Sequence, residues 1–193
     1  MNLPTCRGAL AALGAAALAL QGCSSNETGA EETAEASDET LAAMVAEADG
    51  LSTVSDALTE AGLAQVFDGA AAYTLFAPQD GAFEELGEAG DDLRSPEQRA
   101  AMVAILRDHI VPGYLTPDDI ANAVEMADDG SVEMRTMGDH VLTFTGEGDV
   151  ITVTSEDGSK ASFAGDALRA SNGVAIPLDG VLKKVAPQPA TPA

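Results

Sequence analysis

The residues of this chain that could carry reactive chemistry are few and far apart. Cysteine and histidine each occur twice, as Cys6, Cys23, His109 and His140. A zinc site needs about four ligands close together, and two histidines at this separation do not provide one. No Gly-x-Ser-x-Gly elbow and no glycine-rich phosphate loop occur in the sequence. We therefore expect no enzyme activity, no cofactor and no metal site, while a Ser-His-Asp triad assembled from distant segments is left open.

Each histidine also has a structural explanation. His109 closes an apolar stripe with helical spacing, so we expect it to be buried and hydrogen-bonded to backbone near the Pro112-Gly113 turn. The alternative for His109 is a ligand or a catalytic base. His140 follows Gly138-Asp139 between two strand patterns, and we expect it to be an exposed turn residue.

Cys23 has the clearest chemical role. Arg7 precedes an apolar run of about thirteen residues, too short to span a bilayer, that ends in Leu20-Gln21-Gly22-Cys23. This ending resembles the bacterial lipoprotein box, in which the chain is cut before the cysteine and that cysteine is acylated. The resemblance implies a signal peptide at 1–22, lipidation of Cys23 and a bacterial envelope location, in the outer membrane or at the cell surface or periplasm. The alternative is an ordinary secretory signal.

The segments on either side of the expected domain are polar or proline-rich. Cys6 would be lost with the signal and Cys23 would be blocked, which leaves no thiol for a disulfide or a redox pair. Residues 23–38 then form an acidic, disordered tether that begins at the acylated cysteine. Residues 187–193 form a proline-rich tail.

Charge excludes one class of partner. The formal net charge is −23, from 9 basic and 32 acidic residues. The electrostatic field of this charge repels phosphate backbones, so we expect no nucleic-acid binding. It also repels anionic lipid headgroups, so the acyl anchor must hold the protein at the membrane. Solubility in a salt-rich habitat explains the charge most simply. Divalent cations bridging to anionic polymers are the alternative, although no calcium-loop spacing occurs.

Helical patterns dominate the first half of the expected domain. A weak helix is predicted from Leu41 to about Ala48, and a stronger one is predicted to open at Thr53 with Asp56 as capping-box partner. Its buried stripe would be Val54, Leu58 and Ala61. Two further helix starts, each a hydroxyl residue followed by proline, are Ser95-Pro96 and Thr116-Pro117.

Strand patterns dominate the second half. The predicted strands are separated by Gly- and Asp-rich turns and cover 141–144, 150–153, 161–163, 174–178 and 181–185. Because helices come mostly first and strands mostly last, the pattern indicates an α+β fold. One further strand precedes the helices of the middle region: Tyr73 to Pro78 is apolar, must end at its proline, and leads at once into a helix beginning at Gln79 or Asp80.

Three motifs occur in order along the chain, at residues 74–83, 109–113 and 172–179, and together they resemble the signatures of the fasciclin-like domain. Thr74-Leu75-Phe76-Ala77-Pro78 with Phe83 is similar to the first signature, and His109-Ile110-Val111-Pro112-Gly113 to the central one. Asn172-Gly173-Val174 with Asp179 is similar to the closing signature. The residues that carry the likeness are Thr74, Phe76, Ala77, Pro78, Phe83, His109, Pro112, Gly113, Asn172, Gly173 and Asp179.

The resemblance implies a fold and a function. The fold is a single α+β domain at 39–186, a twisted β-sandwich or wedge with helices packed along one side. The function is a non-enzymatic adhesion or interaction module that binds a surface polysaccharide or an envelope protein. In some relatives an Asp-Ile pair binds a receptor, but Ala167-Leu168 stand at that position, so those contacts are not carried over. Asp108 and Ile176 replace a tyrosine and a histidine of the signatures.

Two other functions are kept as alternatives. One is a periplasmic small-ligand-binding or enzymatic lipoprotein with a pocket near His109. The other is a structural spacer without a specific partner. Asn172-Gly173 is expected to be a turn with positive φ at the entry to the last strands, rather than a binding site.

Overall fold

The computed structural model describes residues 37–67, 69, 71–148 and 150–184. All of them lie in one unit of the chain, whose core is two four-stranded sheets. The expected signal peptide, Cys23, most of the tether and the proline-rich tail lie outside the described residues. Within those residues, no helix is long and apolar enough to cross a membrane.

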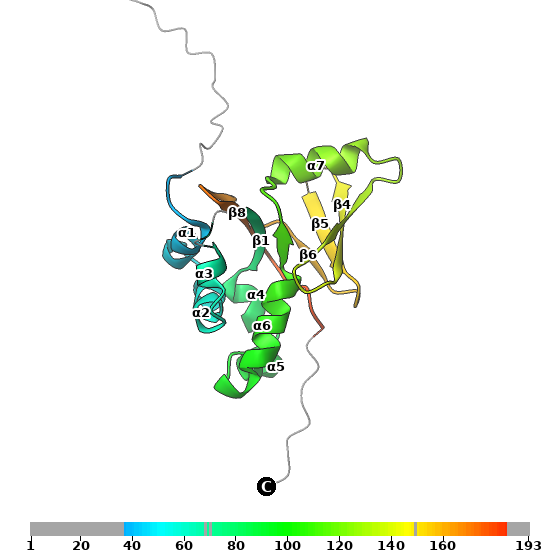
Figure 1. Ribbon diagram of the computed structural model, residues 1–193. Coiled ribbons are helices and arrows are strands. Elements are labelled where there is room, and N and C mark those ends of the chain that lie inside the picture. The colour runs from blue at the N-terminus through cyan, green and yellow to red at the C-terminus, as the bar shows by residue number, and fades with distance from the viewer. Residues whose placement is uncertain (1–36, 68, 70, 149, 185–193) are drawn as a thin grey trace, which may run out of the picture. The chain divides into compact units, whose positions relative to one another are not determined.

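The first sheet joins the two signature strands of the chain. Its order is β2 (Ile110–Pro112), β1 (Tyr73–Pro78), β8 (Gly173–Leu178) and β7 (Leu168–Ala170). β1 and β8 run parallel and in full register, with Tyr73 opposite Gly173 and Pro78 opposite Leu178, while the other pairs are antiparallel. Segments about a hundred residues apart thus form the centre of the sheet (Figure 1).

The second sheet is an antiparallel meander. Its strands are β3 (Ser131–Arg135), β4 (Val141–Glu147), β5 (Val150–Ser155) and β6 (Lys160–Ser162), paired in chain order. Gly130 and Gly158 take positive φ in the turns before β3 and before β6, as the Asp-Gly pairs at these places indicate. Aromatic rings connect the two sheets: Phe76 of β1 lies 5.1 Å from Phe144 of β4, centroid to centroid.

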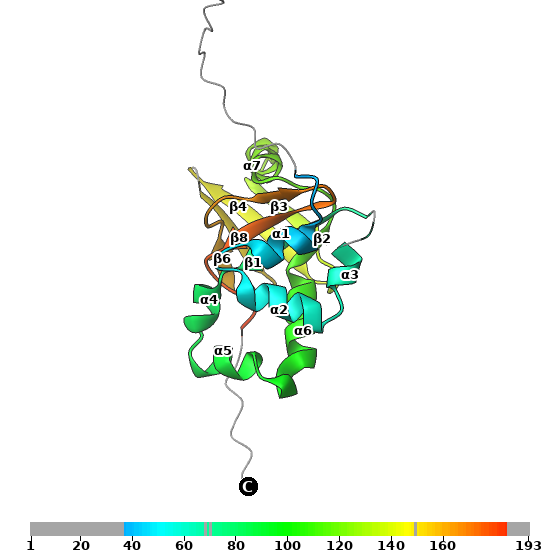
Figure 2. The same cartoon turned by 90° about the vertical axis from the view of Figure 1, so that its left-hand side faces the viewer.

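Most helices lie on one face of the first sheet, and Figure 2 shows them from that side. They are α1 (Leu41–Glu47), α2 (Ser52–Glu60), α3 (Ala64–Phe67), α4 (Asp80–Glu84), α5 (Glu88–Leu93), the short 3-10 helix Pro96–Gln98, and α6 (Arg99–Asp108). The last helix, α7 (Pro117–Met126), packs instead on β3 and β4.

Alternation along the first sheet divides the core in two. In β1, Leu75 and Ala77 face the helices and Phe76 faces the second sheet. In β8, Ala175 faces the helices, while Val174 and Ile176 face the second sheet. The first sheet is therefore buried on both faces, which explains why its two central strands are apolar throughout. This arrangement confirms the α+β sandwich with helices along one side.

Several predicted elements are confirmed. β1 ends at Pro78, α4 begins at Asp80, and α1 spans Leu41–Glu47. Thr116 caps α7 through a capping box with Asp119. The helix predicted from Ser95-Pro96 begins with a 3-10 turn, and Ser95 makes no side-chain cap hydrogen bond.

Other predictions were wrong. Asp56 does not complete a capping box at Thr53; the helix begins at Ser52, and the carboxylate of Asp80 takes the capping role from another helix. Residues 181–184 do not form a strand. Gly173 is not a positive-φ residue.

A close approach explains Gly173 instead. It begins β8 directly beside β1, where a Cβ atom would collide with the Tyr73 carbonyl oxygen and lie 2.9 Å from Leu41 Cδ2. A side chain is therefore excluded by space and not by backbone conformation.

Candidate functional site

His109 is fully buried at the end of α6. Its Nδ1 lies 2.8 Å from the Ile105 carbonyl oxygen, and its Nε2 accepts a hydrogen bond from the Leu182 N–H at 3.0 Å. Because Nε2 is the acceptor, the proton is on Nδ1 and the ring is neutral. Burial lowers the pKa of His109 to about 4. Burial and backbone hydrogen bonding are therefore as predicted, although the second bond comes from Leu182 rather than from the Pro112-Gly113 turn.

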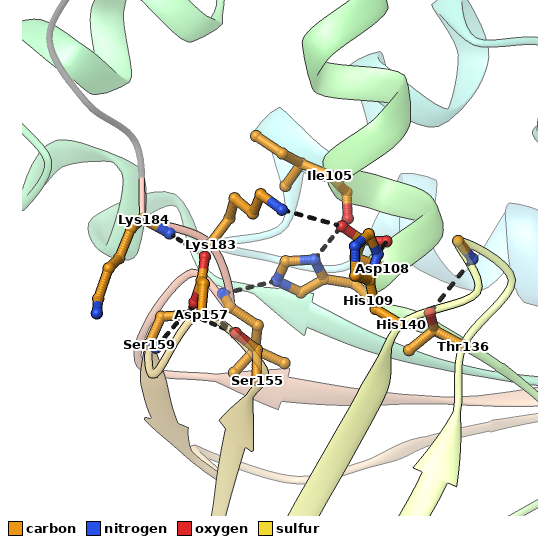
Figure 3. A network of polar contacts seen from close by, with 12 residues as sticks. Ile105, Asp108, His109, Thr136, His140, Ser155, Asp157, Ser159, Lys183 and Lys184 are labelled. Carbon is orange, nitrogen blue, oxygen red and sulfur yellow. Dashed lines mark hydrogen bonds and ion pairs between the residues drawn. The ribbon is translucent and has the colours of Figure 1, made fainter.

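The neighbouring Asp108 carries the polar cluster that sequence reasoning missed. Its side chain is 9% exposed, and Oδ1 lies 2.6 Å from His140 Nδ1 while Oδ2 lies 3.7 Å from Lys183 Nζ. Figure 3 shows Lys183 reaching toward Asp108 from the segment after β8. Three separate parts of the chain thus meet at one carboxylate. His140 follows the turn at residues 137–139 and is half-exposed, which agrees with the prediction. Its pairing with Asp108 was not predicted.

The β3–β4 turn positions His140. The Gly138 N–H bonds the Arg107 carbonyl oxygen at 3.1 Å, and the Met137 N–H bonds the Ile110 carbonyl oxygen at 2.8 Å. A Cβ at Gly138 would collide with the Asp108 carboxylate. The turn is therefore clamped against the end of α6, which places His140 beside Asp108.

A groove of about 600 Å³ opens at this cluster. Its walls come from α5, α6, the β3–β4 turn and the segment after β8. Its volume falls within the range of small-molecule sites. His109 does not line it, so the pocket expected near His109 begins one residue earlier, at Asp108.

A smaller cavity of about 260 Å³ lies beside His140 and contains Ser155. The Ser155 hydroxyl donates to Asp157 Oδ1 at 2.6 Å and lies 2.8 Å from the Ser159 hydroxyl. Among the described contacts of Ser155, none is to His140. Asp108 and His140 thus provide the carboxylate and imidazole of a triad, but in the described part of the chain Ser155 is not hydrogen-bonded to that imidazole.

Asp157 fastens the segment after β8 from its other side. Its Oδ2 accepts a hydrogen bond from the Lys184 N–H at 2.8 Å, and its Oδ1 accepts from Ser155 and Ser159. Burial opposes ionisation of Asp157, but these hydrogen bonds outweigh it and hold its pKa far below the usual value. His109 and Asp157 together hold the segment 182–184 against the domain.

The residues of the first two fasciclin-like signatures build the junction of β1, β2 and α4. Thr74 Oγ1 donates to the Gly113 carbonyl oxygen and accepts from the Leu115 N–H, both at 2.9 Å. Gly113 has φ 120°, and Pro112 ends β2. The remaining members are apolar and buried: Phe76, Ala77, Pro78 and Phe83.

The residues of the closing signature connect the ends of the domain. Asn172 Oδ1 accepts from the Leu41 N–H at 2.8 Å, and its Nδ2 donates to the Phe67 and Gly69 carbonyl oxygens. Asp179 Oδ1 accepts from the Ser162 N–H at 2.6 Å. These signature residues lie within the fold and do not come together in the groove.

Nothing local in the sequence could have identified the cluster of Asp108, His140 and Lys183. The three residues are far apart in the chain, and each is common in a polar segment. The available signal was Asp108 itself, an ionisable residue placed between the buried Leu106 and His109 near the end of a helix.

The chain matches a family model over most of its length. The model, described as Fasciclin domain, covers residues 49–184. A similar solved structure is the FAS1 domain pair from the insect cell adhesion molecule Fasciclin I, with a TM-score of 0.65 and 16% sequence identity. That match covers 76% of this chain and 51% of the other, so this chain spans about half of that structure. At this identity the likeness concerns the fold alone, and no curated protein matches the chain.

Proposed function

The chain belongs to the fasciclin domain family, and from this premise we propose that it is a non-enzymatic adhesion module anchored to a bacterial envelope by acylated Cys23. Fasciclin domains are generally adhesion or interaction modules. The family match over 49–184 is the observation that carries this proposal. The lipoprotein-like ending at Cys23 supports the anchor.

The state of the histidines supports a non-enzymatic role. Both ring nitrogens of His109 are engaged by backbone groups, so no substrate proton can reach them. His140 is held by Asp108 without a partner nucleophile among its described contacts. His109 is therefore not available for proton transfer, and among the described residues His140 is not paired with a nucleophile that it could activate.

We infer the partner class from charge and location. The chain has a net charge of −23, which disfavours nucleic acid and anionic headgroups. A neutral surface polysaccharide or an envelope protein with a basic patch fits better, and the membrane contact is made by the anchor.

Attachment of cells tests the role directly. Cells lacking the protein are compared with cells that regain either the native form or Cys23→Ser. Loss of attachment to surfaces or neighbouring cells, restored only by the native form, is the expected result. Unchanged attachment in all strains would refute adhesion as the main role. Membrane fractionation of the same strains separates a failed anchor from a failed adhesion function.

The alternative of a pocket near His109 has less support. A catalytic or ligating His109 would have to face solvent, and this ring is fully buried. The groove at Asp108 is nevertheless large enough for a small molecule.

A further inference from the structure

We infer that the groove at the end of α6 is a binding site for a small amphipathic carboxylate, with an apolar body along α6 and the carboxylate among the basic residues near Asp108. This inference goes beyond the adhesion role and does not depend on it. It rests on the shape of the groove, its apolar wall and its concentration of basic side chains.

The apolar wall is made of small and medium side chains. Ala101, Val103 and Ala104 line the groove from α6, and Leu93 and Met137 line it from α5 and the β3–β4 turn. Ala104 is exposed, and Ala101 and Val103 are partly exposed, so a ligand would remove apolar surface from water. This face of α6 leaves space for a ligand because it carries alanines, whereas longer side chains would fill the groove.

Basic side chains gather at this groove in a chain that has few of them. Of 9 lysines and arginines, Arg107, Lys183 and Lys184 line it, whereas only three of the 32 acidic residues do. Within the described residues, neither Arg107 nor Lys184 has a side-chain hydrogen bond or ion pair. Two cations are therefore available to a ligand.

The acidic residues of the groove do not cancel this preference. Asp108 is already engaged by His140 and Lys183, while Asp92 and Asp139 are exposed and so screened by water and salt. The balance of charge is even here, against −23 for the whole chain. An anion therefore meets less repulsion in this groove than the average surface would give it.

A single carboxylate on an apolar body fits these features best. A neutral apolar molecule would leave Arg107 and Lys184 without a partner, and a cation would add a further positive charge beside them. Lys183 lines the groove and points toward Asp108 (Figure 3), and its ammonium group has donors left for a second carboxylate.

Titration of the full chain carrying Cys23→Ser tests the site. Decanoate is the probe, and decanol and decyltrimethylammonium have the same apolar chain with no charge or the opposite charge. Each is added below its aggregation concentration while amide chemical shifts are followed. We expect saturable decanoate binding, at least tenfold tighter than decyltrimethylammonium, with the shifts concentrated at 100–108, 137–140 and 183–184.

Two matched pairs of variants locate the contacts. Ala104→Phe fills the exposed wall of the groove and should weaken decanoate binding at least tenfold, whereas Ala43→Phe, at an exposed position of α1 outside the groove, should not. Arg107→Gln with Lys184→Gln removes the two cations without a described partner; it should weaken decanoate binding about fivefold and leave decanol binding unchanged, because rim ion pairs contribute modestly. Lys160→Gln, outside the groove, is the charge control.

Each outcome decides the proposal. Equal affinity for decanoate and decanol would keep the groove but refute the carboxylate class. Binding that Ala104→Phe leaves unchanged, or no saturable binding by any probe, would refute the site. None of these results bears on the attachment experiment, so the two functions fail separately.

Discussion

The buried ring of His109 connects the last described segment of the domain to α6 through hydrogen bonds. Its two nitrogens connect α6, through Ile105, to the segment after β8, through Leu182. This works only while the ring is neutral, since a protonated Nε2 would point a second donor at the Leu182 N–H. The signature residue is therefore explained by hydrogen bonding between distant segments and needs no catalytic role.

The pH dependence of stability should show this neutral ring. The pKa of His109 is about 4 in the folded chain, against 6.5 as its ordinary value. Between these values the unfolded chain binds the extra proton, so the free energy of unfolding falls as pH drops from about 6.5 to 4. We expect a loss on the order of 3 kcal/mol, measured by urea unfolding at each pH.

Two controls isolate the contribution of His109. His109→Gln keeps an acceptor and a donor but has no titrating ring, so it should flatten the slope between pH 6.5 and 4. In the native chain, the His109 ring resonances should not titrate above about pH 5. A full titration near pH 6.5 would contradict the buried neutral state. Asp80, Asp119 and Asp157 have pKa values below the ordinary 3.8. Their contribution to the free energy of unfolding is therefore lost mainly below pH 3.8, outside the range in which His109 acts.

At this scale, sequence reasoning succeeded where periodicity defined the environment. The apolar helical stripe predicted a buried, backbone-bonded His109. It could not identify the ion pairs of Asp108 with His140 and Lys183, because those partners come from other elements and no local pattern links them.

Asp80 connects two helices at the level of elements. It is the first residue of α4, but its carboxylate accepts hydrogen bonds from the Ser52 N–H, the Ser52 hydroxyl and the Thr53 N–H at the start of α2. Burial opposes its ionisation, yet these hydrogen bonds outweigh it and lower its pKa. The carboxylate therefore serves as the N-terminal cap that α2 lacks in its own sequence.

Removing this carboxylate should destabilise the domain. Asp80→Ala leaves the first N–H groups of α2 without their acceptor, and we expect a cost of about 1–2 kcal/mol in urea unfolding. Faster amide exchange at Ser52 and Thr53 should accompany it. Glu84→Ala, on the exposed face of the same helix, is the control and should change stability little. Equal effects of the two variants would contradict the cap.

The close approach of β1 and β8 at Gly173 should make the stability of the domain sensitive to a side chain at this position. Gly173→Ala would push a Cβ into the Tyr73 carbonyl oxygen, so we expect a loss of about 1–3 kcal/mol or a failure to fold. Gly81→Ala in α4 meets nothing within 4 Å and should be neutral or stabilising by about 0.5–1 kcal/mol. Thermal unfolding of both variants measures the difference. A tolerated Gly173→Ala would show that the two strands can separate without cost.

Elements were predictable where their caps were local. Thr116 and Asp119 lie three residues apart and cap α7 as expected, whereas the cap of α2 comes from a residue far along the chain. The strands β2 and β7 have three residues each, which is too few for an alternating pattern to predict them. The strand predicted at 181–185 does not form over residues 181–184, because hydrogen bonds to His109 and Asp157 hold this segment in an irregular path.

Charge acts on the molecule as a whole. Among the described residues, only a few carboxylates form ion pairs, such as Asp91 with Arg94 and Glu60 with Arg99. With 32 acidic residues against 9 basic ones, the acidic residues as a group repel one another. Self-repulsion of this kind favours the expanded unfolded chain over the folded one. Added salt screens it, because the Debye length falls from about 30 Å at 0.01 M to about 3 Å at 1 M.

Salt should therefore raise stability without any specific ion site. We expect Tm to rise by at least about 2 °C between 0.01 M and 1 M NaCl, which is on the order of 1 kcal/mol for a domain of this size. MgCl₂ at matched ionic strength should act like NaCl, since no described group of three His, Cys, Asp or Glu residues is placed to hold a metal ion. A larger, saturable rise with Mg²⁺ or Ca²⁺ at millimolar concentration would contradict screening. It would favour instead the binding of divalent cations, through which an acidic domain could bridge to anionic surface polymers.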